Sequence, residues 1–234
     1  MKKAYFIFLR DLDYFLPLGK RKAAVECSFR GNQSVKHLIE SLGVPHTEVG
    51  KILANGRLIS LNHITQDGDQ IEVHPPAPGC PLEPRFLLDN HLGKLAAYLR
   101  MLGFDCLYHN TYQDDELAGL VHQGERILLS RDRRLLMRKV VVHGYCPRSL
   151  EPGEQLGEVI RRFDLAGKIT PFRRCLRCNH PLEPVSKQAV LHRLEPLTKK
   201  YFDEFHLCPV CNQVYWKGSH YERMQKLIIG LEKK

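Results

Sequence analysis

The pattern Cys-x-x-Cys occurs twice in the C-terminal part of the sequence, and it strongly restricts how this part can fold. One pair is Cys175 and Cys178, and the other is Cys208 and Cys211. Four thiolates in two such pairs are typical of a closed, tetrahedral zinc site. Folding of the surrounding segment then depends on the metal. We therefore predict a zinc ribbon over residues 171–234, with these cysteines holding a structural Zn²⁺.

The stretch between the two pairs is longer than in common zinc sites, and it contains KQAVLHRLEPL and KKYFDEF, which have helical character. An ordered insertion is therefore expected, and a redox-active dithiol is the alternative function of the cysteines. The sequence after the second pair mixes aromatic and basic side chains, a mixture that suits single-stranded nucleic acid. For Trp216 we favour a place in the ribbon core, followed by a C-terminal helix.

The charge of the chain favours a polyanionic partner. The formal net charge is +9, and residues 171–234 carry 12 Lys and Arg against 6 Asp and Glu. This excess makes the C-terminal segment the expected electrostatic contact surface. No apolar run is long enough to cross a membrane, and the first residues lack the features of a signal peptide. We expect a cytoplasmic protein without membrane contact.

A stretch rich in proline and glycine, HPPAPGCPLEP, separates the N-terminal part from the rest. We predict a linker over residues 77–84 after a domain of residues 1–76. In that domain, Ser34 and Gly43 are placed to cap a helix, and Asn55-Gly56 indicates a hairpin turn. The remaining segments favour strands at 4–16, 23–29, 51–59 and 67–75.

This order of strands and helix resembles the β-grasp of ubiquitin and of the small sulfur-carrier proteins, which share phrases such as LGVP and GDQIEV. Those carriers act through a free C-terminal Gly-Gly, whereas this segment continues into HPPAPG. The resemblance therefore implies a docking or scaffolding domain with a protein partner, rather than sulfur transfer.

After the linker, short apolar strands alternate with amphipathic helices. This alternation predicts a parallel α/β sheet over residues 85–170. The chain is thus expected to combine α/β and α+β domains. The predicted strands are 85–89, 104–110, 126–132 and 140–145, and the predicted helices are 91–103, 114–124 and 133–139.

Acidic residues follow the strands of this predicted sheet. Asp89 ends the first strand and Asp132 the third, while Asp114 and Asp115 open the helix after the second. Because parallel strands carry their carboxyl ends at one edge, we expect these side chains to converge. Carboxylates gathered in one cleft are typical of Mg²⁺ or Mn²⁺ sites. Helix caps, an Asx turn and a surface ion pair are the structural alternatives for the individual residues.

The phrases RFLLDNHLGKLAAYLRMLGFDCLYHN and DDELAGLVHQGERILLSRDRRLL resemble the RNase domain at the C-terminus of the Mut-seven exonuclease, a family of PIN-like nucleases. The resemblance extends from about residue 85 to 234. The N-terminal part is similar to the ubiquitin-like domain that precedes such RNase domains in bacterial proteins. On this resemblance Asp89 is the first metal-binding acid, Asp114 or Asp115 the second, and Asp132 the third.

The same resemblance matches Lys94 and Arg100 to the basic positions of the first helix. Together with Arg131 and Arg133 they are candidate phosphate contacts, and a solvated helix face or a structural ion pair is the alternative. We therefore predict a metal-dependent ribonuclease in which a water molecule attacks the RNA phosphodiester. Single-stranded RNA, or RNA like tRNA or rRNA, is the expected substrate. The alternative is an RNA- or ribosome-associated binding protein with a degenerate site.

Overall fold

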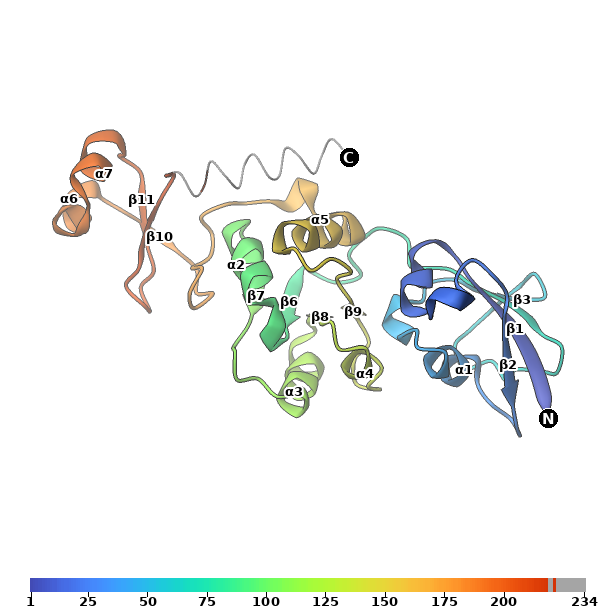
Figure 1. Ribbon diagram of the computed structural model, residues 1–234. Coiled ribbons are helices and arrows are strands. Elements are labelled where there is room, and N and C mark those ends of the chain that lie inside the picture. The colour runs from blue at the N-terminus through green and yellow to red at the C-terminus, as the bar shows by residue number, and fades with distance from the viewer. Residues whose placement is uncertain (219–220, 222–234) are drawn as a thin grey trace. The chain divides into compact units, whose positions relative to one another are not determined.

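The computed structural model describes residues 1–218 and 221 of the chain (Figure 1). The predicted C-terminal helix lies outside these residues. By its internal contacts the chain forms two compact units. The first contains Met1–Pro78 and Gln113–Arg148, and the second contains Gly79–Tyr112 and the chain from Ser149 onward. None of the described helices combines the length and the apolar character needed to cross a bilayer.

A five-stranded sheet of strand order β2-β1-β5-β3-β4 forms the N-terminal part of the first unit (Figure 1). The central strands β1 and β5 are parallel, and the other neighbours are antiparallel. This confirms the predicted β-grasp. The strands are β1 (Lys2–Phe8), β2 (Val25–Phe29), β3 (Ile52–Ala54), β4 (Arg57–Ile59) and β5 (Gln70–Val73).

Local sequence explains the turns of this sheet. Asn55 and Gly56 both have positive φ, as a two-residue hairpin between β3 and β4 requires. The Ser34 side chain accepts a hydrogen bond from the His37 N–H and caps α1 (Val35–Ser41), as predicted. The first strand ends earlier than residue 16, because Arg10 has a φ of 57° and begins a helical turn. Three 3-10 helices complete this part: η1 (Arg10–Phe15), η2 (Leu18–Lys20) and η3 (His46–Glu48).

The later segment of the first unit contains short elements. The predicted strand 140–145 is reduced to two residues, because β9 pairs only with the three-residue β8, and Val140 and Val142 are exposed. The predicted helix 133–139 is reduced to one turn. The elements are α3 (Asp114–Gly124), β8 (Ile127–Leu129), α4 (Arg133–Leu136) and β9 (Gly144–Tyr145).

The central sheet has the strand order β7-β6-β8-β9, and its strands β6 and β7 are parallel, which agrees with the predicted α/β class. Its core in the second unit is aromatic: the Phe86 ring lies 5.7 Å from that of Phe163 and 6.1 Å from that of Phe104. Phe163 belongs to a helix that the sequence analysis did not single out. The elements are β6 (Arg85–Leu88), η4 (Asn90–Leu92), α2 (Gly93–Met101), β7 (Asp105–Leu107), α5 (Pro152–Phe163) and η5 (Ala166–Lys168).

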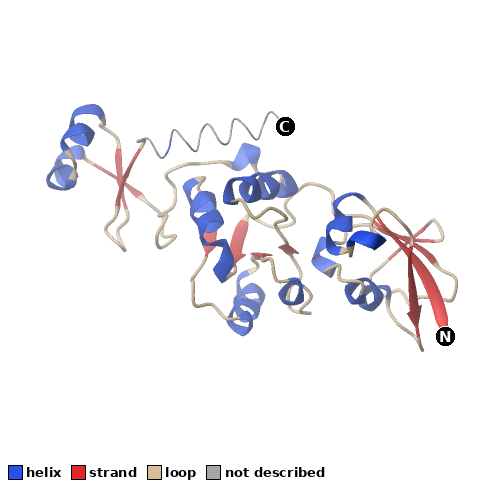
Figure 2. Ribbon diagram, viewed as in Figure 1, coloured by secondary structure: helices blue, strands red, loops and turns tan. Residues whose placement is uncertain are grey.

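The last part of the second unit is a three-stranded antiparallel sheet with short helices inserted between its strands (Figure 2). Val190, Leu194, Phe205 and Val214 form its core, and Trp216 packs against them. The insertion between the cysteine pairs is thus ordered. Its elements are β10 (Glu183–Val185), α6 (Lys187–Val190), η6 (Leu191–Arg193), α7 (Pro196–Tyr201), β11 (Phe205–Leu207) and β12 (Val214–Trp216).

Candidate functional site

Each Cys-x-x-Cys pair forms a tight turn that is closed by two backbone hydrogen bonds. The Cys175 N–H donates to the His180 carbonyl (2.8 Å), and the Asn179 N–H donates to the Cys175 carbonyl (2.9 Å). Cys208 and Asn212 make the equivalent bonds, at 3.0 and 2.9 Å. Both asparagines have positive φ, which asparagine adopts more readily than most residues. The repeated sequence Cys-x-x-Cys-Asn therefore builds the same turn twice.

The two turns bring the four sulfur atoms together. The Cys175 and Cys211 sulfurs are 3.4 Å apart, as are those of Cys178 and Cys208. All four lie within 4.8 Å of one another. A zinc ion with bonds of about 2.3 Å to sulfur needs S···S separations of about 3.8 Å. The four cysteines therefore fit a structural Zn²⁺, as predicted from their spacing.

Tyr215 supports this cluster from β12. Its hydroxyl lies 3.2 Å from the Cys175 sulfur and accepts a hydrogen bond from the Leu176 N–H (3.1 Å). Partial burial alone raises the pKa of Cys175, but hydrogen bonds from the Tyr215 hydroxyl and from the Cys178 N–H lower it to about 6. The Cys175 thiolate, the form that binds metal, is therefore favoured at neutral pH.

Arg100 fastens the first cysteine turn to α2. The side chain is only 4% exposed, and its guanidinium donates to three carbonyl oxygens, those of Cys106 (2.9 Å), Leu176 and Arg177 (3.0 Å each). Asn179 adds a second connection, because its side chain accepts from the Cys106 N–H (3.0 Å). No local sequence pattern indicates this bracing role of Arg100, which the family resemblance matches to a phosphate contact.

Asp89 and Asp132 both follow strands of the central sheet, and each caps a short helix. Asp89 is 4% exposed, and its Oδ1 accepts from the His91 N–H (3.0 Å). The Oδ1 of Asp132 accepts from the N–H groups of Arg134 (2.7 Å) and Leu135 (3.3 Å). The Asx turn considered for Asp89 is thus present, whereas Asp132 caps a helix where a surface ion pair was the alternative considered. Each described cap uses only Oδ1.

Asp114 and Asp115 begin α3 and lie near Arg138. The Asp115 carboxylate pairs with the Arg138 guanidinium at 2.5 Å, and the same group donates to the Asp114 carbonyl at 3.4 Å. The pKa of Arg138 is raised by the hydrogen bond to Asp115 and by the charges of Asp115, Asp114 and Asp132. Three of the predicted acids therefore act on one guanidinium within the first unit.

The aspartates and the cysteines differ in how closely they are gathered. Within residues 1–218 and 221, the four cysteines are the one group of three or more His, Cys, Asp or Glu side chains whose ligand atoms lie close enough to share a metal ion. The four predicted aspartates do not form such a group in these residues. The four cysteines thus form a complete ligand set for zinc, whereas the predicted aspartates are not gathered closely enough to share a metal ion.

The other predicted basic residues have different surroundings. Lys94 is exposed on α2, and Arg131 is half-buried after β8. Arg133 donates to the Phe15 carbonyl (2.8 Å), and its guanidinium lies over the rings of Tyr14 and Phe15, at 5.5 and 5.1 Å from their centroids. Arg133 thus joins α4 to η1 of the β-grasp.

A buried ion pair that sequence reasoning missed lies beside this contact. Glu48 is 1% exposed, and its carboxylate accepts from both terminal nitrogens of Arg148, at 3.1 and 2.8 Å. It also accepts from the Cys146 N–H at 2.6 Å. The Arg148 guanidinium lies over the Phe15 and Tyr145 rings, at 4.6 and 4.8 Å. No local pattern marks either residue, because they are distant in sequence.

Comparison with known proteins assigns both parts of the chain. The family model described as Mut7-C RNAse domain matches residues 84–228, and the model described as Mut7-C ubiquitin matches residues 1–78. A search of curated proteins gave no match. Among solved structures, the crystal structure of SAMP1 from Haloferax volcanii matches with 21% identity and a TM-score of 0.27, over 33% of this chain and 98% of that chain. The chain therefore belongs to the Mut7-C RNase domain family and carries the Mut7-C ubiquitin domain at its N-terminus.

Proposed function

We propose that this protein is a metal-dependent ribonuclease that hydrolyses RNA phosphodiester bonds. The observation that carries the proposal is the Mut7-C RNase domain match over residues 84–228. Within this range, Asp89 follows β6 and Asp132 follows β8, two strands of the central sheet. Ligands of parallel α/β sheets bind outside the carboxyl ends of the strands, where these residues stand.

We assign Asp89, Asp114 and Asp132 as the metal-binding carboxylates. The Oδ2 of Asp132 can serve as a ligand while Oδ1 keeps the helix cap. Asp115 pairs with Arg138, and we give it the role of holding the start of α3. Bound Mg²⁺ or Mn²⁺ would activate a water molecule and stabilise the leaving oxygen. In the hydrolysis a water oxygen bonds to phosphorus, the bond from phosphorus to the leaving oxygen breaks, and that oxygen gains a proton.

Lys94 and Arg131 are the basic residues that we assign to the phosphates of the substrate. Lys94 is exposed and lies five residues after Asp89, and Arg131 directly precedes Asp132. Arg100 and Arg133 donate to backbone carbonyls, so we give them structural roles. Single-stranded RNA, or the accessible strands of RNA like tRNA or rRNA, suits such backbone contacts.

The two remaining parts of the chain would assist this reaction. Residues 171–234 carry 12 basic and 6 acidic side chains, and this excess of positive charge suits a ribbon that guides RNA. The ubiquitin-like domain would bind a protein partner. A reducing compartment such as the cytoplasm keeps cysteines available as zinc ligands, so we place the protein there.

The test is cleavage of labelled single-stranded RNA, structured RNA and single-stranded DNA by the full-length protein, with Mg²⁺, with Mn²⁺ or with no added divalent ion. Omitting the ion is preferable to adding a chelator, because a chelator also removes zinc. We expect cleavage of RNA only with the added ion, and its loss in Asp89→Asn and Asp132→Asn. Asp203→Asn, which changes an exposed acid on the ribbon, is the matched control and should cleave normally. Cleavage that survives both active-site changes would contradict the assignment.

One observation favours a second function, RNA binding without catalysis. Within the described residues the four aspartates do not form a group that is ready to share a metal ion. A protein of this kind would bind single-stranded RNA tightly, and Mn²⁺ would change neither the RNA nor its affinity. Folded wild-type protein that binds RNA but releases no product with either ion would therefore favour this function.

A further inference from the structure

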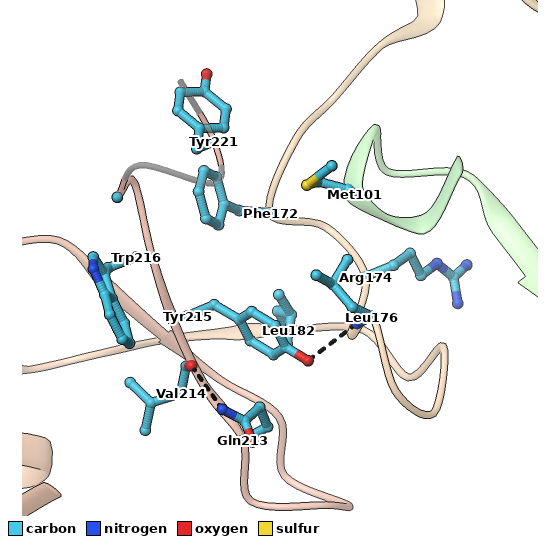
Figure 3. A pocket seen from close by; sticks show the side chains of 11 residues that line it. Met101, Phe172, Arg174, Leu176, Leu182, Gln213, Val214, Tyr215, Trp216 and Tyr221 are labelled. Carbon is cyan, nitrogen blue, oxygen red and sulfur yellow. Dashed lines mark hydrogen bonds between the residues drawn. The ribbon is translucent and has the colours of Figure 1, made fainter. Parts of the chain in front are cut away.

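An aromatic pocket of about 250 Å³ lies in the second unit and is formed mainly by residues of the zinc ribbon (Figure 3). Trp216 and Tyr215 contribute from β12, Phe172 from the segment before the first cysteine turn, and Tyr221 from the chain after β12. The other lining residues are Met101, Arg174, Leu176, Leu182, Gln213, Val214 and Gly218. None of the proposed catalytic acids is among the residues that line this pocket.

The rings of this pocket are held by neighbouring side chains. Phe172 lies 5.1 Å from the Tyr221 ring and stacks on His206 at 5.4 Å. Trp216 packs against Phe205 of the ribbon core at 6.3 Å. The core position that we favoured for Trp216 is thus present, and the same side chain also lines the pocket. Figure 3 shows the Phe172 and Tyr221 rings next to each other, with Trp216 on the other side of the ribbon strand.

Polar groups at the pocket give it a recognition element. The Gln213 side chain lines the pocket and donates from Nε2 to the Val214 carbonyl (3.3 Å). A carboxamide carries a second N–H and an acceptor oxygen, the pair of groups that meets the edge of a base. Tyr215 also lines the pocket, and its hydroxyl is engaged by the Leu176 N–H and the Cys175 sulfur. Gln213 is therefore the group suited to a ligand with both donors and acceptors on a flat ring.

The electrostatic surroundings favour an anionic ligand. Arg173 and Arg177 are exposed on the segment that also carries Phe172, and the whole range 171–234 has twice as many basic as acidic residues. Aromatic rings beside such a basic surface are typical of proteins that stack single-stranded bases. An apolar small molecule would make no use of these charges.

We propose that this pocket receives one unstacked base of single-stranded RNA, with Phe172 and Tyr221 as stacking surfaces and Gln213 at the edge of the base. This inference rests on the proposed function only for the identity of the nucleic acid. It gives the ribbon a defined task, because a base held here fixes the strand that enters the RNase domain. A size of about 250 Å³ is just below the usual range for drug-sized ligands, which suits one or two small rings.

The single tryptophan of the chain makes this proposal directly measurable. Because Trp216 is the only tryptophan of the sequence and lines the pocket, the tryptophan fluorescence comes from one side chain in the pocket lining. The experiment adds RNA hexamers to the full-length, zinc-loaded protein without Mg²⁺ or Mn²⁺, and it follows both Trp216 fluorescence and the anisotropy of the labelled RNA. The probes are single-stranded hexa-adenylate and hexa-uridylate, a duplex of the same length, and an abasic hexamer with the same phosphates.

We expect both single-stranded hexamers to change the fluorescence of Trp216, and the duplex and abasic hexamers to leave it unchanged. Tyr221→Leu and Phe172→Leu keep apolar volume but remove a ring. Each should weaken binding of the single strands roughly five- to hundred-fold, the range for losing one base stack. Tyr201→Leu removes an exposed ring of the same ribbon that does not line the pocket, and it should bind like the wild type. Zinc content and circular dichroism confirm that each variant is folded.

Two results would overturn the proposal: an equal fluorescence change with the abasic hexamer, or RNA binding by anisotropy with no change at Trp216. If only one of Tyr221→Leu and Phe172→Leu folds, the affinity of that variant for the single-stranded hexamers still tests the proposal. Cleavage separates this inference from the proposed function. A normal fluorescence change without any cleavage would refute the nuclease and support the base pocket, whereas metal-dependent cleavage with a silent Trp216 would refute the pocket alone.

Discussion

Glu48 of the ubiquitin-like domain and Arg148 at the end of the segment 113–148 form a buried, two-pronged ion pair, with N···O distances of 3.1 and 2.8 Å. The Arg148 guanidinium also lies over the Phe15 ring at 4.6 Å. Arg133 donates to the Phe15 carbonyl from the same segment. The ubiquitin-like domain is therefore joined to part of the RNase domain by charge pairs and stacked rings, and this face of it is not available for a partner.

Replacing Glu48 with alanine should destabilise the protein strongly. The change removes the buried carboxylate that faces Arg148 and leaves the exposed Asp11 as its acidic partner. Losing one member of a comparable buried pair costs about 3–5 kcal/mol. Urea unfolding followed by circular dichroism measures the loss. Glu26→Ala removes an acid of the exposed Lys3–Glu26 pair and should leave the unfolding midpoint unchanged. Equal midpoints for wild type and Glu48→Ala would contradict the importance of the pair.

Arg100 and Lys94 lie on the same helix and should respond differently to substitution. Arg100→Met leaves three carbonyl oxygens without their described donor, so we expect a loss of about 2–4 kcal/mol in the free energy of unfolding. Lys94→Gln should not change stability but should reduce the slope of log affinity for single-stranded RNA against log salt by about 0.7. Urea unfolding and a salt titration of RNA binding distinguish the two. A lower salt slope in folded Arg100→Met would restore its predicted role at the phosphates.

The contrast between these two residues shows what the sequence can reveal. The zinc ligands were predictable because Cys-x-x-Cys is a local pattern whose chemistry has few alternatives. The β-grasp was predictable because Ser34 and the Asn55-Gly56 turn act on their immediate neighbours. Arg100 was matched to a basic position by resemblance, but its partners are carbonyls 76 and 77 residues away, which no local pattern reveals.

Element lengths were harder to predict than element types. The first strand was expected to reach residue 16, yet it ends at Phe8, because the residues after it form the 3-10 helix that carries Phe15 to Arg133 and Arg148. The strand at 140–145 is likewise shortened by the length of β8. In both cases, contacts with distant parts of the chain end the strand earlier than its apolar sequence predicts.

The buried Cys146 thiol should be protected from alkylation. It should also make the free energy of unfolding depend on pH in alkaline solution. Burial raises the pKa of its thiol from 9.0 to about 11. The unfolded thiol ionises first, so its contribution is complete below pH 9 and is lost between pH 9 and 11, to a total of about 3 kcal/mol. The difference in urea stability between wild type and Cys146→Ala should therefore shrink over that interval. In the folded protein at pH 8, mass spectrometry should find Cys146 unmodified by iodoacetamide. Rapid modification under these conditions would contradict its burial.

Asp114 and Asp115 should be separable by their effect on cleavage. Asp115 is engaged by Arg138, and its side chain is 92% exposed, so Asp115→Asn should reduce the rate of RNA cleavage only slightly. Asp114→Asn removes a proposed metal ligand and should reduce the rate at least a hundred-fold. The two variants are matched, because the same chemical change is made at neighbouring positions. Measuring cleavage over a range of Mn²⁺ concentrations tests whether Asp114→Asn also raises the Mn²⁺ concentration that half-maximal cleavage needs. The reverse ranking of the two variants would show that Asp115 is the ligand.

Tyr215→Phe should weaken zinc binding without unfolding the ribbon. The hydroxyl lies 3.2 Å from the Cys175 sulfur, and it contributes to the lowered pKa of that thiol. Partners that hydrogen-bond to a metal ligand typically account for ten- to hundred-fold in affinity. Competition with a chromophoric zinc chelator measures this change. Tyr201→Phe removes a hydroxyl from an exposed tyrosine of the same ribbon and should bind zinc like the wild type. Equal zinc affinities for all three proteins would mean that the contact with Tyr215 positions the ring and does not tune the thiolate.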